Sequence, residues 1–137
     1  MNQALPVGLT WPDYFPDDCP PGDAQVADGE VYRLVSQNPP LNTDFRPRVI
    51  EQTNGEYSSN LCKACGLSVF RDLSDIEETR RYSGALKNKI VAKGTLIPEA
   101  GVLKTTPNAR RGGKTHSTWW VPDEFDPTHL FQVIENE

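Results

Sequence analysis

The sequence has no apolar run that approaches the roughly 18 residues of a transmembrane helix. Its first residues also lack the basic and apolar segments of a secretory signal. It contains three cysteines, an odd number that does not suit a disulfide framework. These absences argue against a membrane protein and a secreted disulfide scaffold, and they predict a cytoplasmic protein with free thiols.

Positive charge is also scarce, because 14 Lys and Arg face 19 Asp and Glu and leave a net charge of −5. This balance disfavours nucleic-acid binding, which depends on clustered basic side chains. The charges are separated along the chain. Residues 1–30 contain no base, and their acids are Asp13, Asp17, Asp18, Asp23, Asp28 and Glu30. Residues 104–114 contain no acid, and their bases are Lys104, Arg110, Arg111 and Lys114.

A chain of 137 residues fits one domain, and its 12 prolines and 10 glycines predict short elements joined by turns. Residues 1–29 are rich in proline and predict an extended arm. Its rings, Trp11, Tyr14 and Phe15, favour an arm packed on the domain over one that orders only on a partner. Residues 30–137 are expected to form a single compact domain.

Several short runs are rich in β-branched and aromatic residues or alternate polar and apolar side chains. They predict strands at 30–35, 67–70, 89–97, 102–104 and 115–121. We expect a bulge or bend at Gly94, and a hairpin that joins 89–97 to 102–104. A helical turn at 42–45 is also allowed.

One helix is predicted over about 74–83, with Asp72 or Ser74 as its N-cap and Gly84 after its end. Near the C-terminus, residues 126–128 predict a helical start, after which a helix or a last strand is open, and the β-branched Val133 and Ile134 favour the strand after one helical turn. These elements indicate an α+β fold. It is a small, mostly antiparallel sheet or a partly open barrel, with one or two short helices and the Pro-rich arm.

Cys62 and Cys65 form a C-x-x-C pair directly before a strand. Such a pair can supply two zinc thiolates, and Cys19 and His116 could complete a site of four ligands. Because only one pair has motif spacing, we expect no metal and interpret both cysteines as small buried residues. A thioredoxin-like role is disfavoured, since those motifs precede a helix rather than a strand.

A candidate binding surface lies in the loop with Arg110, Arg111 and Lys114 and the strand that follows it. This loop lacks the spacing of a phosphate loop, so we interpret it as a mobile surface loop. Trp119 and Trp120 point to opposite faces of the strand. One indole belongs to the core, and the other is either a binding anchor or is covered by the arm.

Arg33 lies in the centre of an apolar strand and needs a partner, for which Asp44 and Glu51 are structural candidates. The segments Val31-Tyr32-Arg33 and Gly66-Leu67-Ser68-Val69-Phe70, followed by a helix and further strands, resemble small ADP-ribosyltransferase-like domains. The resemblance implies that a first strand offers Arg to the nicotinamide cofactor, that a later strand offers Ser, and that a last strand offers Glu. No glutamate lies in the last strand here, because the first acids after Trp120 are Asp123 and Glu124.

Two functional hypotheses follow from these features. The first is a cytoplasmic protein without cofactor that acts through contacts with another protein, as an accessory subunit or inhibitor of a larger bacterial or phage system. The alternative is an ADP-ribosyltransferase-like enzyme or toxin domain that uses NAD, with catalytic Arg33, Ser68 and His116 around one pocket. Convergence of these three side chains would favour the enzyme, and their dispersal would favour the binding protein.

Overall fold

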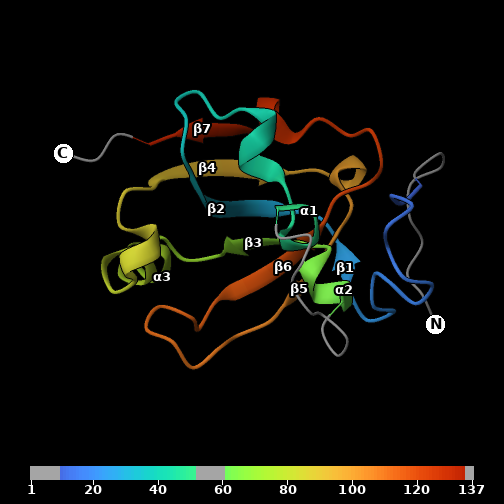
Figure 1. Cartoon of the computed structure of the whole chain (residues 1–137), viewed down its shortest axis with the longest axis horizontal. Helices are drawn as coiled ribbons and strands as arrows, with labels where there is room; N and C mark the ends of the chain where they lie inside the picture. The colour runs from blue at the N-terminus through green and yellow to red at the C-terminus, as the bar shows by residue number, and fades with distance from the viewer. Residues whose placement is uncertain (1–9, 52–60, 135–137) are drawn as a thin grey trace.

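The computed structural model of the protein describes residues 10–51, apart from the Glu51 side chain, and residues 61–134. These residues form a seven-stranded open sheet with short helices around it (Figure 1). Every strand pair is antiparallel. The predicted α+β class is therefore confirmed, in its sheet form rather than as a barrel.

The sheet has the strand order β1-β5-β6-β3-β2-β4-β7. The strands are β1 Gln25–Val26, β2 Gly29–Val35, β3 Leu67–Phe70, β4 Ile90–Leu96, β5 Val102–Thr105, β6 His116–Trp120 and β7 Phe131–Val133. β2 and β4 pair along their whole length, whereas β2 and β3 are joined only at Tyr32 and Phe70. The strands β2 and β3 therefore separate beyond that single pair of residues, next to Arg33 and Ser68.

The predicted strands are present, but two details of their arrangement were wrong. The hairpin is absent because β4 pairs with β2 and β7, whereas β5 pairs with β1 and β6. Gly94 is not at a bulge, since it pairs with Val31 in a continuous register. A Cβ at Gly94 would lie 2.6 Å from the Phe131 ring, so glycine is needed there for the close approach of that ring.

The described helices are short. The α-helices are α1 Arg48–Glu51, α2 Leu61–Ala64 and α3 Leu73–Arg81, and the 3-10 turns are η1 Asn42–Phe45, η2 Gly84–Leu86, η3 Pro98–Ala100 and η4 Pro127–Leu130. α3 begins where the sequence predicts, with the Asp72 carboxylate accepting a 3.0 Å hydrogen bond from the Ser74 amide. The predicted terminal turn and strand are η4 and β7.

Both faces of the sheet bury apolar side chains, as the alternation along its strands requires. One face carries the main core, which includes Val31, Val35, Leu67, Val69, Leu96, Trp119 and Phe131. On the other face, Phe70 and Val91 pack with Ile76 of α3. Farther along this second face, Trp120 packs with Cys19 and Cys65.

The described part of the arm lies against the domain, at the end of the sheet away from α3 (Figure 1). Trp11 and Phe15 stack with ring centroids 5.8 Å apart and contact the cluster around Trp120. The arm then contributes β1, which pairs with β5. Residues 1–9, 52–60 and 135–137 lie outside the described residues.

Candidate functional site

Cys19 and Cys62 form a disulfide, and Cys65 is a buried free thiol. This corrects the expectation of free thiols throughout. The odd number of cysteines was a poor guide, because the arm folds back and brings the Cα atoms of Cys19 and Cys62 to 5.4 Å. The two bridged sulfurs are not available as zinc thiolates. The four zinc ligands considered from the sequence, Cys19, Cys62, Cys65 and His116, therefore do not form a metal site. No other group of three potential metal ligands occurs among residues 10–51 and 61–134.

Ser68 and His116 form a polar pair on the second face of the sheet. They lie on neighbouring strands, where Phe70 of β3 pairs with His116 of β6. Ser68 is exposed, whereas His116 is only 8% exposed. The imidazole Nε2 lies 3.0 Å from the Ser68 hydroxyl, and its Nδ1 lies 2.9 Å from the carbonyl oxygen of Thr106.

These contacts fix the tautomer of His116. A carbonyl oxygen only accepts hydrogen bonds, so Nδ1 carries the proton and donates it to Thr106. Burial lowers the pKa of His116, and the positive charges of Lys63 and Arg110 lower it further, against the raising effect of the Thr106 bond. The neutral ring therefore presents a lone pair at Nε2, and the Ser68 hydroxyl donates to it.

The His116 ring belongs to a longer row of polar side chains. The Thr106 hydroxyl lies 3.0 Å from His116 Nδ1 and 2.9 Å from the hydroxyl of Thr118, which is 2% exposed. Edge-on contact with the Phe70 ring, at a centroid distance of 5.3 Å, holds the imidazole from another side. An exposed hydroxyl, an acceptor nitrogen and an orienting carbonyl are the groups needed for nucleophilic or general-base chemistry.

Arg33 reaches the same serine from a different direction. Its Nη1 donates a 2.6 Å hydrogen bond to the Ser68 carbonyl, and its Nε donates a 3.0 Å bond to the Asp44 carbonyl. The guanidinium also lies 5.6 Å from the centroid of the Phe45 ring.

The Asp44 carboxylate, one of the two partners predicted for Arg33, accepts hydrogen bonds from the backbone amides of Ser36 and Leu41. The alternative partner, Glu51, has a side chain outside the described residues.

Ser68 is thus the link between Arg33 and His116, but the three side chains do not share one face. Tyr32 pairs with Phe70 and lies on the second face of the sheet. Its neighbour Arg33 therefore points from the opposite face, which carries the main core. Ser68 leaves the face that carries His116. The guanidinium meets the Ser68 backbone where β2 and β3 part, which corrects the expectation of three side chains around one simple pocket.

Neither tryptophan of β6 is a surface anchor. Trp119 is 0% exposed and Trp120 is 2% exposed, and each indole N–H donates a 2.8 Å hydrogen bond, to the carbonyls of Ala100 and Cys62 respectively. Trp11 and Phe15 of the arm pack against the Trp120 cluster. The binding role expected for an exposed indole is therefore corrected, because the arm covers the second ring.

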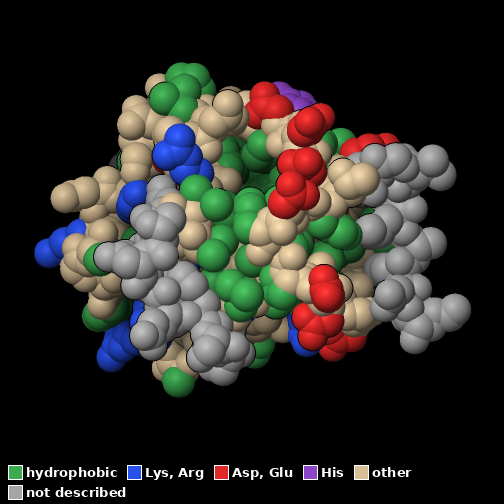
Figure 2. All heavy atoms as spheres, turned by 45° about the vertical axis from the view of Figure 1, so that its right-hand side comes forward, with side chains coloured by type: hydrophobic (Ala, Val, Ile, Leu, Met, Phe, Trp, Pro, Cys, Tyr) green, Lys and Arg blue, Asp and Glu red, His purple; other side chains and the backbone are tan. Residues whose placement is uncertain are grey.

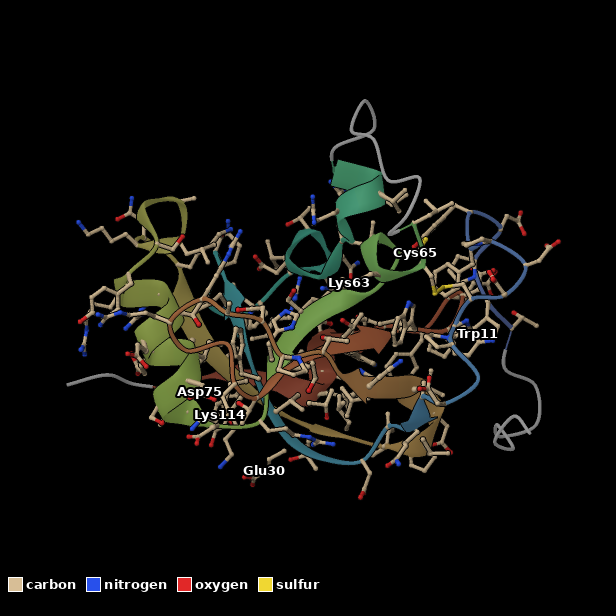
Figure 3. The ribbon with its side chains drawn as sticks, turned by 90° about the horizontal axis from the view of Figure 1, so that it is seen from below. Trp11, Glu30, Lys63, Cys65, Asp75 and Lys114 are labelled. Atoms are coloured by element: carbon tan, nitrogen blue, oxygen red, sulfur yellow. A yellow bond between two sulfur atoms is a disulfide. The ribbon has the colours of Figure 1, made fainter. Side chains whose placement is uncertain are left out.

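The three basic side chains of the loop, Arg110, Arg111 and Lys114, do not all lie in the same surroundings. Arg111 turns onto α3, where its guanidinium lies 4.3 Å from the Tyr82 ring centroid and 3.9 Å from the Glu78 carboxylate. Lys114 is exposed and lies beside Asp75 of α3 (Figure 3). Of the three predicted cations, Arg110 is the one whose charge acts on His116. The predicted cluster of all three around His116 is therefore incomplete.

Lys63 is the cation that sequence reasoning missed. It is exposed, its charge acts on His116, and it lies over the sheet near the start of β3 (Figure 3). The signal was its place inside Cys62-Lys63-Ala64-Cys65, directly before the strand that carries Ser68. Lys63 and Arg110 together make the surroundings of the Ser68–His116 pair electropositive.

A separate hollow of about 320 Å³ lies between the arm, the start of β3 and the segment after β6. Its lining includes Tyr14, Phe45, Leu67, Asp123, Glu124 and Phe125. Neither Ser68 nor His116 lines it. The sequence contains no spacing motif that would have grouped these residues.

None of the helices in the described part of the chain has the length and apolar character needed to cross a membrane. No family model, no curated protein and no solved structure matches this chain. The Ser68–His116 pair, with Arg33 bonded to the Ser68 carbonyl and the charges of Lys63 and Arg110 acting on the imidazole, is the most developed polar arrangement among the predicted site residues.

Proposed function

We propose that the protein is an ADP-ribosyltransferase-like enzyme that acts on NAD, with Ser68 and His116 as its polar centre. One observation carries this proposal. The Ser68 hydroxyl is hydrogen-bonded to His116, and the Ser68 carbonyl accepts a hydrogen bond from Arg33. Ser68 lies where the pairing of β2 with β3 ends. The family resemblance implies an arginine from a first strand and a serine from a later one, and Arg33 and Ser68 occupy such strands. Two of the three predicted side chains, Ser68 and His116, converge as the enzyme requires, whereas the Arg33 side chain lies on the opposite face and contacts the Ser68 backbone.

The charges around the pair suit a nucleotide. The positive charges of Lys63 and Arg110 act on the neutral imidazole, and cationic side chains of this kind bind phosphate groups. In ADP-ribosyl transfer, the bond from nicotinamide to ribose breaks, nicotinamide leaves, and the acceptor loses a proton as it takes the ADP-ribosyl group. His116 lies on β6, neither β6 nor β7 contains the glutamate that the resemblance implies, and the His116 Nε2 offers a hydrogen-bond acceptor without negative charge.

The experiment measures nicotinamide release from NAD by the purified protein. We expect release by the wild type and a loss of about tenfold or more in Ser68→Ala and His116→Gln, the size expected for a lost acid–base group. Thr105→Ala is the matched control, because Thr105 is an exposed hydroxyl on β5 that pairs with Ser117 on the opposite face. Absence of release, together with an unchanged amide NMR spectrum at millimolar NAD, would contradict the proposal.

A second candidate is the role expected first from the sequence, in which the protein contacts another protein as an accessory subunit or inhibitor of a larger bacterial or phage system. The hollow with Tyr14, Phe45 and Phe125 favours it, since aromatic-lined hollows are common sites for partner side chains. Inactivity toward NAD combined with peptide binding at the hollow would favour this candidate over the enzyme.

The cytosolic location predicted from the sequence stays a prediction. The Cys19–Cys62 disulfide favours instead a compartment in which disulfides persist. Trapping the thiols with an alkylating reagent at the moment of cell lysis would decide between the two. One modified cysteine per chain fits the oxidising compartment, and three fit the cytosol.

A further inference from the structure

The hollow between the arm and the segment after β6 is lined by both apolar and polar side chains. Phe45, Leu67 and Phe125 line it, and Tyr14 of the arm borders it. Figure 2 shows apolar side chains gathered on this face, with carboxylates along one side and basic groups at the opposite margin. The volume of about 320 Å³ is at the lower end of the range for ligand sites.

Two carboxylates lie on the rim of the hollow. Asp123 and Glu124 both line it and are both exposed. Within residues 10–51 and 61–134, neither carboxylate takes part in an ion pair. Arg46 is the basic residue of the lining. Burial raises the pKa of Tyr14, and the Cys65 and Asp123 side chains raise it further, in that order.

The backbone at Glu124 has an uncommon conformation. Glu124 has φ 65°, and it is the one residue with a side chain at positive φ in the described part of the chain. Residues other than glycine rarely adopt this conformation, and such residues are concentrated at binding and catalytic sites. The strained residue here is one of the two rim acids.

We propose that the hollow binds an arginine side chain presented by another protein. A guanidinium stacks on aromatic rings and donates paired hydrogen bonds to carboxylates, and the hollow offers both kinds of group. The apolar stem of arginine matches the walls formed by Leu67 and Phe125. Lysine fits less well, because a compact ammonium cannot make the same stacked and forked contacts.

A protein segment is favoured over free arginine by the charge beyond the hollow. The arm carries exposed Asp13, Asp17 and Asp18, so negative potential continues past the rim. The α-carboxylate of a free amino acid would face these acids, whereas a peptide has no such charge next to its arginine. This inference rests on the protein-contact candidate and is independent of NAD turnover, which nicotinamide release measures separately.

The test is a fluorescence anisotropy titration of the full chain with a labelled Gly-Ser-Arg-Ser-Gly peptide. The same peptide with citrulline in place of arginine keeps the shape and removes the charge. We expect binding of the arginine peptide to weaken about tenfold or more with citrulline, and by a similar factor in Asp123→Asn/Glu124→Gln. The matched control is Asp17→Asn/Asp18→Asn, which makes the same change in net charge on the arm, where neither residue lines the hollow.

Four outcomes would overturn the proposal: absence of peptide binding at millimolar concentration, equal binding of the citrulline peptide, equal weakening in the arm control, or displacement of the peptide by free arginine at equal concentration. The third outcome would assign the binding to long-range charge, and the fourth would assign it to a free amino acid. Thermal melting of both double variants checks that they are folded. The citrulline comparison uses the wild-type protein and so does not depend on any variant.

Discussion

The indole Nε1 of Trp120 donates a 2.8 Å hydrogen bond to the backbone carbonyl of Cys62. This bond ties β6 to α2, at the residue whose sulfur is bridged to Cys19 of the arm. The arm, α2 and the sheet therefore meet at one point. The C-x-x-C segment serves here as a structural connection next to the strand that carries Ser68.

Substituting Trp120→Phe should lower the free energy of unfolding by about 1–3 kcal/mol, because the buried ring loses its hydrogen bond to the Cys62 carbonyl, which keeps only the 3.1 Å bond from the Cys65 amide. Trp11→Phe is the control, since that ring is half-buried and stacks on Phe15. Urea unfolding of both variants gives the comparison. An equal loss in the two variants would mean that the hydrogen bond adds nothing beyond ring size.

Removing the disulfide with Cys19→Ser/Cys62→Ser should cost about 2–4 kcal/mol, because the bridge closes a long loop with a sequence separation of 43. Cys65→Ser is the matched control, as it removes the free thiol and leaves the bridge. Mass spectrometry after alkylation should find one modified cysteine in the unreduced denatured protein and three after reduction. Three before reduction would show that the bridge does not form.

The contrast between α3 and the disulfide shows which features could be predicted from the sequence. The helix follows from local signals, namely the Asp72 cap and the basic residues of its last turn. Strand positions follow from alternation, but their partners do not, so the expected hairpin between 89–97 and 102–104 was wrong. Cys19 and Cys62 meet because of the whole fold, and local spacing cannot reveal such a contact.

The candidate site was partly predictable for the same reason. Arg33, Ser68 and His116 were identifiable as polar residues within apolar strands, and the fold makes β2, β3 and β6 neighbours. The face of the sheet on which each side chain lies depends on the strand register. This register puts the Arg33 and Ser68 side chains on opposite faces of the sheet. The hollow joins the arm to the segment after β6, two parts that are far apart in sequence.

Gly112 should tolerate no side chain. It has φ 77°, and a Cβ there would lie 2.2 Å from the Asp75 carbonyl oxygen of α3. Gly112→Ala should therefore push the loop off α3 and lower the free energy of unfolding by about 1 kcal/mol or more. Gly84→Ala is the control, because a Cβ at Gly84 meets nothing within 4 Å. Urea unfolding should separate them, and similar stabilities would show that the loop shifts freely.

The last prediction concerns the pH dependence of stability and follows from the burial of His116. Burial, with Lys63 and Arg110, lowers its pKa in the folded state below the ordinary value of about 6.5. Below that pH, the unfolded chain binds a proton that the folded chain does not bind. The stabilising contribution is therefore complete above about pH 6.5 and is lost as the pH falls through the folded pKa.

Urea unfolding should then show that the wild type loses more stability than His116→Gln between about pH 7.5 and pH 5.5, because the variant has no imidazole to protonate at this position. The carboxylates of the protein titrate in both chains, so their contribution cancels in the comparison. His129→Gln is the matched control for the loss of an imidazole, since His129 is exposed. Parallel pH profiles for wild type and His116→Gln would mean that the His116 ring accepts a proton as readily in the folded state as in the unfolded state. That result would contradict the assignment of Nε2 as the hydrogen-bond acceptor for the Ser68 hydroxyl.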